Sequence, residues 1–189
     1  MVADGAGAGL ARRAAECAGS RSNVDKVVST GFCGALDPAL GVGDVFVARR
    51  LVREDGSPLC EAADPRSARP HPSGALASVD RVAASIGQRR ALRERGAAAV
   101  EMEAAGVARW AIERGCPFYC VRAVTDQADE SFSIDFDGAR DAEGRFRASK
   151  VLLAAMRRPW RSVPELVRLA WRGRRCSREL GEFLADCAF

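Results

Sequence analysis

The chain has 189 residues, of which 48% are hydrophobic, and this length and composition suit one domain with a substantial core. The net charge is +4, from 29 basic and 25 acidic residues, and no apolar run is long enough to span a bilayer. Seven cysteines without a CxxC pair and one histidine, His71, argue against a structural zinc site or a disulfide framework, so we expect reduced thiols in a cytoplasmic protein.

The chain opens with three glycines, Gly5, Gly7 and Gly9, followed by a predicted helix over residues 10–18. A glycine loop before a helix can hold an anion on free backbone N–H groups. A dinucleotide-binding loop also needs a strand directly before it, and Met1 leaves no room for one. The glycines alone are therefore weak support for a nucleotide-binding fold.

The next segment predicts a strand, a glycine turn, a loop and a second strand. The strands are expected over residues 24–30 and 45–48, with Gly31 and Gly34 in the turn between them. Glycine allows the backbone to approach a ligand closely. The same pattern is common in proteins that have no binding site there.

Residues 51–73 are rich in Pro, Asp, Arg and Ser, which predicts an exposed loop. A strand over residues 74–80 and a charged helix over residues 81–95 are expected to follow. Ser78 or Asp80 is the expected cap of that helix.

Residues 97–130 predict a strand, a helix and a strand. The first strand ends near residue 102, the helix ends before Gly115 and Pro117, and residues 118–124 form the second strand. We expect a parallel βαβ unit that brings Glu101, Glu103 and Asp126 to one edge of the sheet. The simpler alternative gives Glu103 to the positive end of the helix and Asp126 to an ordinary turn.

Beyond Asp126 the sequence predicts an acidic, turn-rich loop and then two amphipathic helices. Their apolar stripes are separated by Pro159 and Pro164. Residues 145–189 form a basic helical region, with ten arginines, one lysine and only Glu165 as an acid between residues 145 and 178. A solvated helix face is the simplest explanation, and binding to nucleic acid or to an anionic lipid surface is the alternative.

Four segments together resemble the nucleoside phosphorylase and nucleosidase superfamily. VEMEAAGVA (residues 100–108) and VRAVTDQAD (residues 121–129) are similar to its paired signature. STGFCGALDPALGVGD (residues 29–44) is similar to a second signature, and GALASVD (residues 74–80) to the strand beside the base. The resemblance implies one α/β domain over residues 1–189, a three-layer fold with a central mixed β-sheet flanked by helices.

The resemblance also implies roles for single residues. Asp126 would hydrogen-bond the purine and act as the general acid, with burial raising its pKa, and Glu103 would hold the ribose hydroxyls. Further substrate-binding residues implied in this way are Glu101, Met102, Cys33, Gly34, Thr125, Arg122 and Val82. No metal or cofactor is implied, although phosphate is a co-substrate in the phosphorylases of this superfamily.

The implied reaction is cleavage of the N-glycosidic bond of an adenine nucleoside, by hydrolysis or by phosphorolysis. The hopanoid-associated branch, whose substrate is an adenosyl-hopane, is resembled by residues 140–170 together with STGFCGALDPAL (residues 29–40). An adenosyl-hopane therefore stands beside 5′-methylthioadenosine and S-adenosylhomocysteine as an implied substrate. Nucleosidases of this superfamily take an acid from their first strand to activate water, while the phosphorylases use a glycine loop and a nearby arginine. We expect no counterpart of that first strand in this sequence. Ser29 and Phe32 stand where one phosphorylase branch binds phosphate, and neither carries a positive charge.

A different interpretation follows from the same residues: an incomplete homologue that binds a purine or nucleoside without turnover. The resemblance further implies a homo-oligomer and a small-molecule substrate. We expect no nucleic acid as partner, and a membrane-surface contact through residues 145–189 stays open as an alternative.

Overall fold

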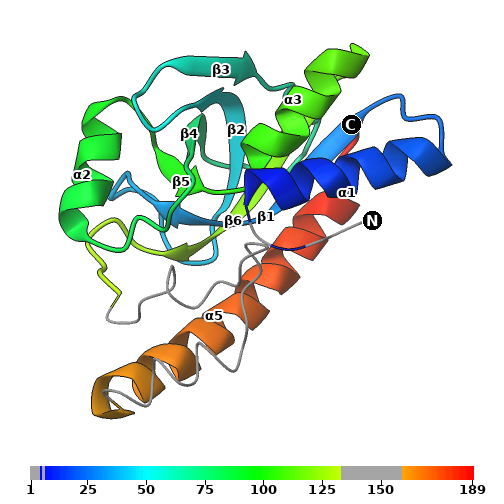
Figure 1. Cartoon of the computed structure of the whole chain (residues 1–189). Helices are drawn as coiled ribbons and strands as arrows, with labels where there is room; N and C mark the ends of the chain where they lie inside the picture. Colours follow the sequence, from blue (N-terminus) through cyan, green and yellow to red (C-terminus); the bar gives the residue numbers. More distant parts are fainter. Residues whose placement is uncertain (1–4, 6, 133–158) are drawn as a thin grey trace.

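The computed structural model describes residues 5, 7–132 and 159–189, and in the last range it describes side chains from residue 164 onward. The elements follow one another as α1 (Ala8–Arg21), β1 (Val27–Ala35), β2 (Val45–Val52), β3 (Pro58–Glu61), β4 (Ser73–Ser78), α2 (Ile86–Glu94), β5 (Ala99–Glu101), α3 (Ala104–Arg114), β6 (Phe118–Asp126) and α5 (Pro159–Ala185). Figure 1 shows the helices lying around a central sheet.

The strands form one mixed sheet that closes on itself. Their order is β3-β2-β4-β5-β1-β6, and β2 also pairs with β6, so β3 alone lies outside the closed ring. Strands β2, β4 and β5 run in one direction, while β1 and β6 run in the other. The predicted α/β fold with a mixed sheet between helices is confirmed.

The predicted parallel βαβ unit is wrong. Strands β5 and β6 are not neighbours, because β1 lies between them, antiparallel to β5 and parallel to β6. They therefore run in opposite directions. Apolar periodicity shows that a segment is a strand, but it carries no information on the direction or order of strands.

The helices cover the sheet from different sides. Helix α1 packs on α3, and α3 packs on β1 and β6. Helix α5 packs on β6, β2 and β1, where Cys176, Leu180 and Phe183 form a buried cluster with Val47 and Val121. None of the described helices has the length and apolar character needed to cross a bilayer.

Other boundaries also differ from the predictions. Gly31 and Gly34 lie inside β1 rather than in a turn. The predicted loop over residues 51–73 contains the end of β2 and all of β3, which pair as antiparallel strands. The helix predicted over residues 81–95 begins only at Ile86. Its cap is Ser85, which forms a capping box with Gln88 in the first turn, and not Ser78 or Asp80.

Helix α5 runs through Pro164, one of the two prolines at which the sequence predicted a break. Pro164 lies inside α5, which continues to Ala185. Pro164 lies close to the N-terminal end of α5, where it removes only one helical hydrogen bond. The other predicted apolar stripe, Leu152, Leu153 and Met156, lies outside the described residues.

Candidate active site

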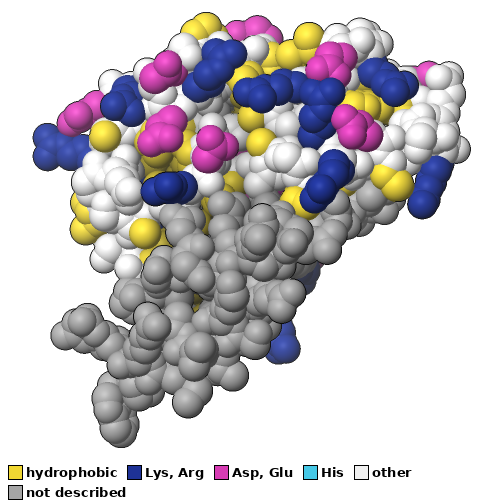
Figure 2. Space-filling model, viewed as in Figure 1, with side chains coloured by type: hydrophobic (Ala, Val, Ile, Leu, Met, Phe, Trp, Pro, Cys, Tyr) yellow, Lys and Arg dark blue, Asp and Glu magenta, His cyan; other side chains and the backbone are white. Residues whose placement is uncertain are grey.

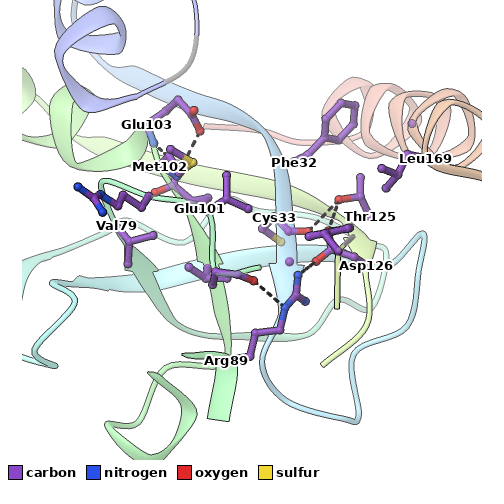
Figure 3. A pocket seen from close by; sticks show the side chains of 17 residues that line it. Phe32, Cys33, Val79, Arg89, Glu101, Met102, Glu103, Thr125, Asp126 and Leu169 are labelled. Carbon is purple, nitrogen blue, oxygen red and sulfur yellow. Dashed lines mark hydrogen bonds and ion pairs between the residues drawn. The ribbon is translucent and has the colours of Figure 1, made fainter. Parts of the chain in front are cut away.

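A cavity of about 400 Å³ lies where β1, β5 and β6 end. Eight of the nine predicted site residues line it: Cys33, Gly34, Val82, Glu101, Met102, Glu103, Thr125 and Asp126. Figure 3 shows Glu101, Met102 and Glu103 on one side and Thr125 and Asp126 on the other, with Cys33 between them. The predicted convergence of three carboxylates is therefore confirmed.

Strand β1 explains the convergence, because its C-terminal end joins the other two strands. Gly34 is paired with Val100 of β5 on one side and with Asp126 of β6 on the other. The pairing of β1 with β6 shifts at this point, so that Thr125 is an extra residue opposite the bond between Cys33 and Gly34. Such a bulge re-aims side chains, which allows the consecutive residues Thr125 and Asp126 both to line the cavity.

Glu101 supports the N-terminal end of α3. Its Oε2 accepts hydrogen bonds from the backbone N–H groups of Glu103 (2.9 Å) and Ala104 (2.8 Å). The same oxygen pairs with Arg122 at 2.8 Å, and both side chains are about 1% exposed. The sequence offered Glu103 as the carboxylate that stabilises the positive N-terminal end of α3. In the structure it is mainly Glu101 that does so.

Arg122, the ninth predicted residue, is absent from the cavity wall that the described residues form. It lies behind Glu101 and also donates to Ser29 Oγ at 2.9 Å. A buried cation of this kind is stabilised by its paired carboxylate. Arg122 thus contacts the site through Glu101.

Glu103 is turned toward the cavity and the start of α1. Its Oε1 accepts from the backbone N–H of Gly7 at 3.0 Å, so the glycine loop does hold an anion, the carboxylate of Glu103. Burial raises the pKa of Glu103, and the nearby negative charge of Glu101 raises it further. A carboxylate in this state is a good acceptor for hydroxyl groups.

Asp126 is buried and held from two sides. Thr125 Oγ1 donates to its Oδ1 at 2.7 Å, and the guanidinium of Arg89 pairs with its Oδ2. Gly34 makes room for this pair, because a Cβ there would lie 2.5 Å from Asp126 Oδ2 and 3.3 Å from Arg89 Nη1. Arg89 thus places a positive charge directly against the buried carboxylate.

Arg89 is the site residue that sequence reasoning missed. It lines the cavity from α2 and is 2% exposed, although α2 has a charged, surface-like sequence. One signal was available: the Ser85–Gln88 capping box fixes where α2 begins, and hence which of its arginines points inward.

The rest of the wall is mainly apolar. It includes Val79, Val82, Ala83, Met102, Phe132 and Leu169. The Cys33 thiol is also present, but burial raises its pKa well above the ordinary value, so it is a poor nucleophile. No cluster of three or more His, Cys, Asp or Glu side chains in the described parts of the chain could hold a metal ion.

Apolar walls with a carboxylate at each side suit a flat ring that carries N–H groups on one side and hydroxyl groups on the other. The ring would lie against the apolar side chains, and Asp126 and Glu103 would accept hydrogen bonds.

Comparison with known proteins gives this geometry a context. The family model described as "Phosphorylase superfamily" matches residues 1–85 and 59–157. The chain is 29% identical to the 5'-methylthioadenosine/S-adenosylhomocysteine nucleosidase of Geobacillus thermodenitrificans over 161 residues, 70% of this chain and 68% of that protein. It is 30% identical to the protein of the same name from Geobacillus kaustophilus over 161 residues, 68% of this chain and 66% of the relative.

Solved structures agree on the fold. The nucleosidase of the same name from S. pneumoniae, solved with a transition-state inhibitor, superposes with a TM-score of 0.57 at 24% identity, covering 80% of this chain and 77% of that one. The chain matches about two thirds of the length of the curated relatives, from 66% to 68% for the two Geobacillus proteins.

Proposed function

Because the chain belongs to the phosphorylase superfamily, we propose that it cleaves the N-glycosidic bond of an adenine nucleoside and releases adenine. The observation that carries the proposal is the placement of Glu103 and Asp126 on different sides of one apolar-walled cavity. The names of the relatives, 5'-methylthioadenosine/S-adenosylhomocysteine nucleosidases, support the substrate class.

Asp126 acts on the base. The bond between the sugar and N9 breaks with its electron pair on the purine, so the leaving group needs a proton at N7 to depart as neutral adenine. The carboxyl group of Asp126 stabilises that proton through a hydrogen bond at N7. Thr125 holds the carboxyl group in position through its contact at 2.7 Å.

Glu103 acts on the sugar. As the bond breaks, positive charge develops on the ribose ring, and a carboxylate that accepts from the ribose hydroxyls stabilises this charge. Met102 and Glu101 complete the sugar side of the cavity, while Cys33, Gly34 and Val82 lie toward the base. Arg122 supports the sugar side by holding Glu101 at 2.8 Å.

The sugar is then captured by water or by phosphate, and no cofactor takes part. Phosphate dependence separates the two reactions, because phosphorolysis yields a sugar 1-phosphate and hydrolysis a free sugar. Product analysis with and without phosphate therefore assigns the acceptor.

An adenosyl-hopane is the substrate to test beside 5′-methylthioadenosine. The apolar side chains of Phe32 and Leu169 line the cavity, and Phe32 is 44% exposed, which would suit an apolar 5′ substituent. Turnover of 5′-methylthioadenosine at least as fast as that of an adenosyl-hopane would argue against the lipid-bearing substrate.

The decisive variant is Asp126→Asn. It keeps the size of the side chain but removes the carboxyl group that stabilises a proton at N7, so adenine release should fall by about 10²-fold or more. Asp129→Asn is the matched control, because Asp129 is exposed in the loop that follows β6. Chromatographic quantification of adenine measures both variants, and equal rates for Asp126→Asn and the parent would remove the role of Asp126.

A binding protein without turnover is the second candidate function. It is favoured by the limited match to the relatives, about two thirds of their length. Calorimetry with adenine and adenosine beside the activity assay decides between the two: binding without released product would support this candidate and overturn the enzyme.

We further assign the chain to the cytoplasm as a homo-oligomeric single domain over residues 1–189, with the basic helical region 145–189 at its C-terminal end. The seven free cysteines and the exposed apolar Ile112 agree with these assignments. A monomer in light scattering would contradict the homo-oligomer.

The charged and apolar side chains on the surface also indicate which partners other than the substrate to expect. Figure 2 shows basic and acidic side chains interspersed on the described face, which favours no nucleic-acid partner there. On α5, Val167 and Trp171 are 65% and 66% exposed beside several arginines, which suits a weak contact with a membrane surface. Equal sedimentation with anionic vesicles by the parent and Trp171→Ser would argue against that contact.

A further inference from the structure

Arg89 breaks two local rules for its position. It lies near the N-terminal end of α2, directly after Gln88, the partner of the N-cap residue Ser85, where the helix dipole disfavours a basic side chain. It is also 2% exposed, and an arginine is buried so fully only when its charge and its N–H groups have partners. Positions that break local rules are often functional.

The partners of Arg89 fix both its place and its direction. Nε donates to the carbonyl oxygen of Ala83 at 3.0 Å, and Nη1 donates to that of Gln127 at 2.9 Å. The guanidinium also lies over the ring of Phe132, with Cζ 5.3 Å from the ring centroid. These contacts connect the cavity wall on α2 with the loop after β6, and they point Nη2 at Asp126.

We propose that Arg89 is a positioning residue for the reaction: it holds Asp126 as an oriented carboxylate, so that Asp126 accepts the N–H of a base that has been protonated from solvent. The inference rests on the proposed function and deepens it. The proton enters at N7 of the bound nucleoside, Asp126 shares it, and the electron pair of the sugar bond leaves with N9. Adenine then departs neutral, and the carboxylate stays paired with Arg89.

Other charged and titratable groups face Asp126 from the neighbouring elements. Arg172 and Cys176 lie on α5, and Cys33 lies on β1. The direct ion pair of Asp126 is with Arg89. The side chain of Arg89 is 3% exposed, and that of Asp126 is 8% exposed. Removal of Arg89 should therefore change the ionisation of Asp126 more than removal of Arg172.

The test compares Arg89→Gln and Arg89→Lys with Arg90→Gln. Arg90 is the next residue of the same helix, but it is exposed and pairs with Glu94 on the surface. Adenine release from 5′-methylthioadenosine is measured from about pH 5 to about pH 9, with kcat and KM determined separately. Thermal unfolding of each variant verifies that it folds.

Arg89→Gln should lower kcat by about 10²-fold, while KM stays within about threefold of the parent value. In the pH profile, the acid limb is the range over which activity falls as the pH is lowered. The acid limb of Arg89→Gln should lie at higher pH than that of the parent, because a buried carboxylate without its cation ionises less readily. Arg89→Lys keeps the charge without the fork geometry, so it should recover part of kcat and leave the acid limb near that of the parent. Arg90→Gln should match the parent in both properties.

A separate readout does not require turnover. The side-chain carboxyl ¹³C resonance of Asp126, assigned by its loss in Asp126→Asn, should titrate at higher pH in Arg89→Gln than in the parent. If the parent releases no adenine, the proposed function fails, and this titration still judges the ion pair. If the parent is active but Arg89→Gln matches Arg90→Gln, or its acid limb moves to lower pH, the role of Arg89 is wrong. If Arg89→Gln does not fold, Arg89→Lys decides: kcat equal to that of the parent would overturn the proposal.

Discussion

Gly34, which has no side chain, leaves the space that the Arg89–Asp126 pair needs. The Arg89–Asp126 pair occupies the space where a Cβ of residue 34 would lie, 2.5 Å from Asp126 Oδ2. Strand propensity alone would favour almost any other residue inside β1. The glycine is therefore explained by the close approach of the carboxylate.

We expect Gly34→Ala to displace the carboxylate of Asp126 and to lower kcat/KM by about 10²-fold, since about 1 Å of misplacement has that effect. The unfolding free energy should fall by about 1–3 kcal/mol from overpacking. Gly87→Ala is the control, because a Cβ there meets no atom within 4 Å. Unchanged kinetics in Gly34→Ala would show that the pair tolerates another position.

Glu103 predicts a pH dependence of stability. Burial, and then the charge of Glu101, raise the pKa of Glu103 in the folded protein, so the folded state binds more protons than the unfolded state as the pH rises from the ordinary glutamate range. Ionisation of Glu103 therefore lowers the free energy of unfolding as the pH rises through that range.

Glu103→Gln removes this cost and keeps an oxygen that can accept from Gly7. Its unfolding midpoint should exceed that of the parent at pH 7.5 and approach it near pH 4, while adenine release falls. Thermal denaturation at the two pH values tests this, and a variant that is less stable at the higher pH would contradict the sign.

At residue level, the sequence could supply the carboxylates but not their partners. Glu101, Glu103 and Asp126 follow directly from strand ends and the resemblance of two short segments. Arg89 is one of several arginines in a charged helix, and only the start of that helix decides which of them is buried. The capping box marks where that helix begins, but the pairing of Arg89 with Asp126 depends on tertiary packing.

Helix α5 is an element whose attachment affects the cavity. Leu169 and Gly173 line the cavity, and the adjacent Arg172 forms two hydrogen bonds with Glu130, at 2.7 and 2.8 Å. The pairing lowers the pKa of Glu130 through the hydrogen bonds of Arg172. Its contribution to stability is therefore present above the ordinary glutamate pKa and is lost as the pH falls through the lowered value.

Arg172→Gln should lower the free energy of unfolding at pH 7 by about 1 kcal/mol, the upper end for a partly exposed pair. For a domain of this size the midpoint then falls by about 2–4 °C. The difference from the parent should shrink near pH 3, and Arg174→Gln, at an exposed position nearby, should have little effect at either pH. A difference that is equally large at pH 3 would show that packing, not the ion pair, is responsible.

The ends of helices and strands were predicted well where a glycine or proline stops the element. Gly115 adopts the left-handed conformation that ends α3, as expected of a glycine at that position. Strand direction was not predictable, because β1 inserts between β5 and β6 through contacts between residues distant in sequence. Pro164 misled the prediction because a proline near the N-terminal end of a helix removes only one hydrogen bond.

The whole molecule places base and sugar recognition on one closed sheet. The ring of β2, β4, β5, β1 and β6 brings ends of β1, β5 and β6 to the same cavity, although β5 runs against the other two. Helices α2 and α5 then complete its walls. We therefore expect a nucleoside to lie in this cavity with its base at Asp126 and its ribose at Glu103.

A crystal structure of Asp126→Asn with 5′-methylthioadenosine tests this claim most directly, because the slowed variant should retain intact substrate. We predict the purine N7 within hydrogen-bond distance of the residue 126 amide, and the ribose hydroxyls about 2.6–3.0 Å from the Glu103 carboxylate. A nucleoside bound outside the cavity, or bound with its ribose at residue 126, would contradict the account.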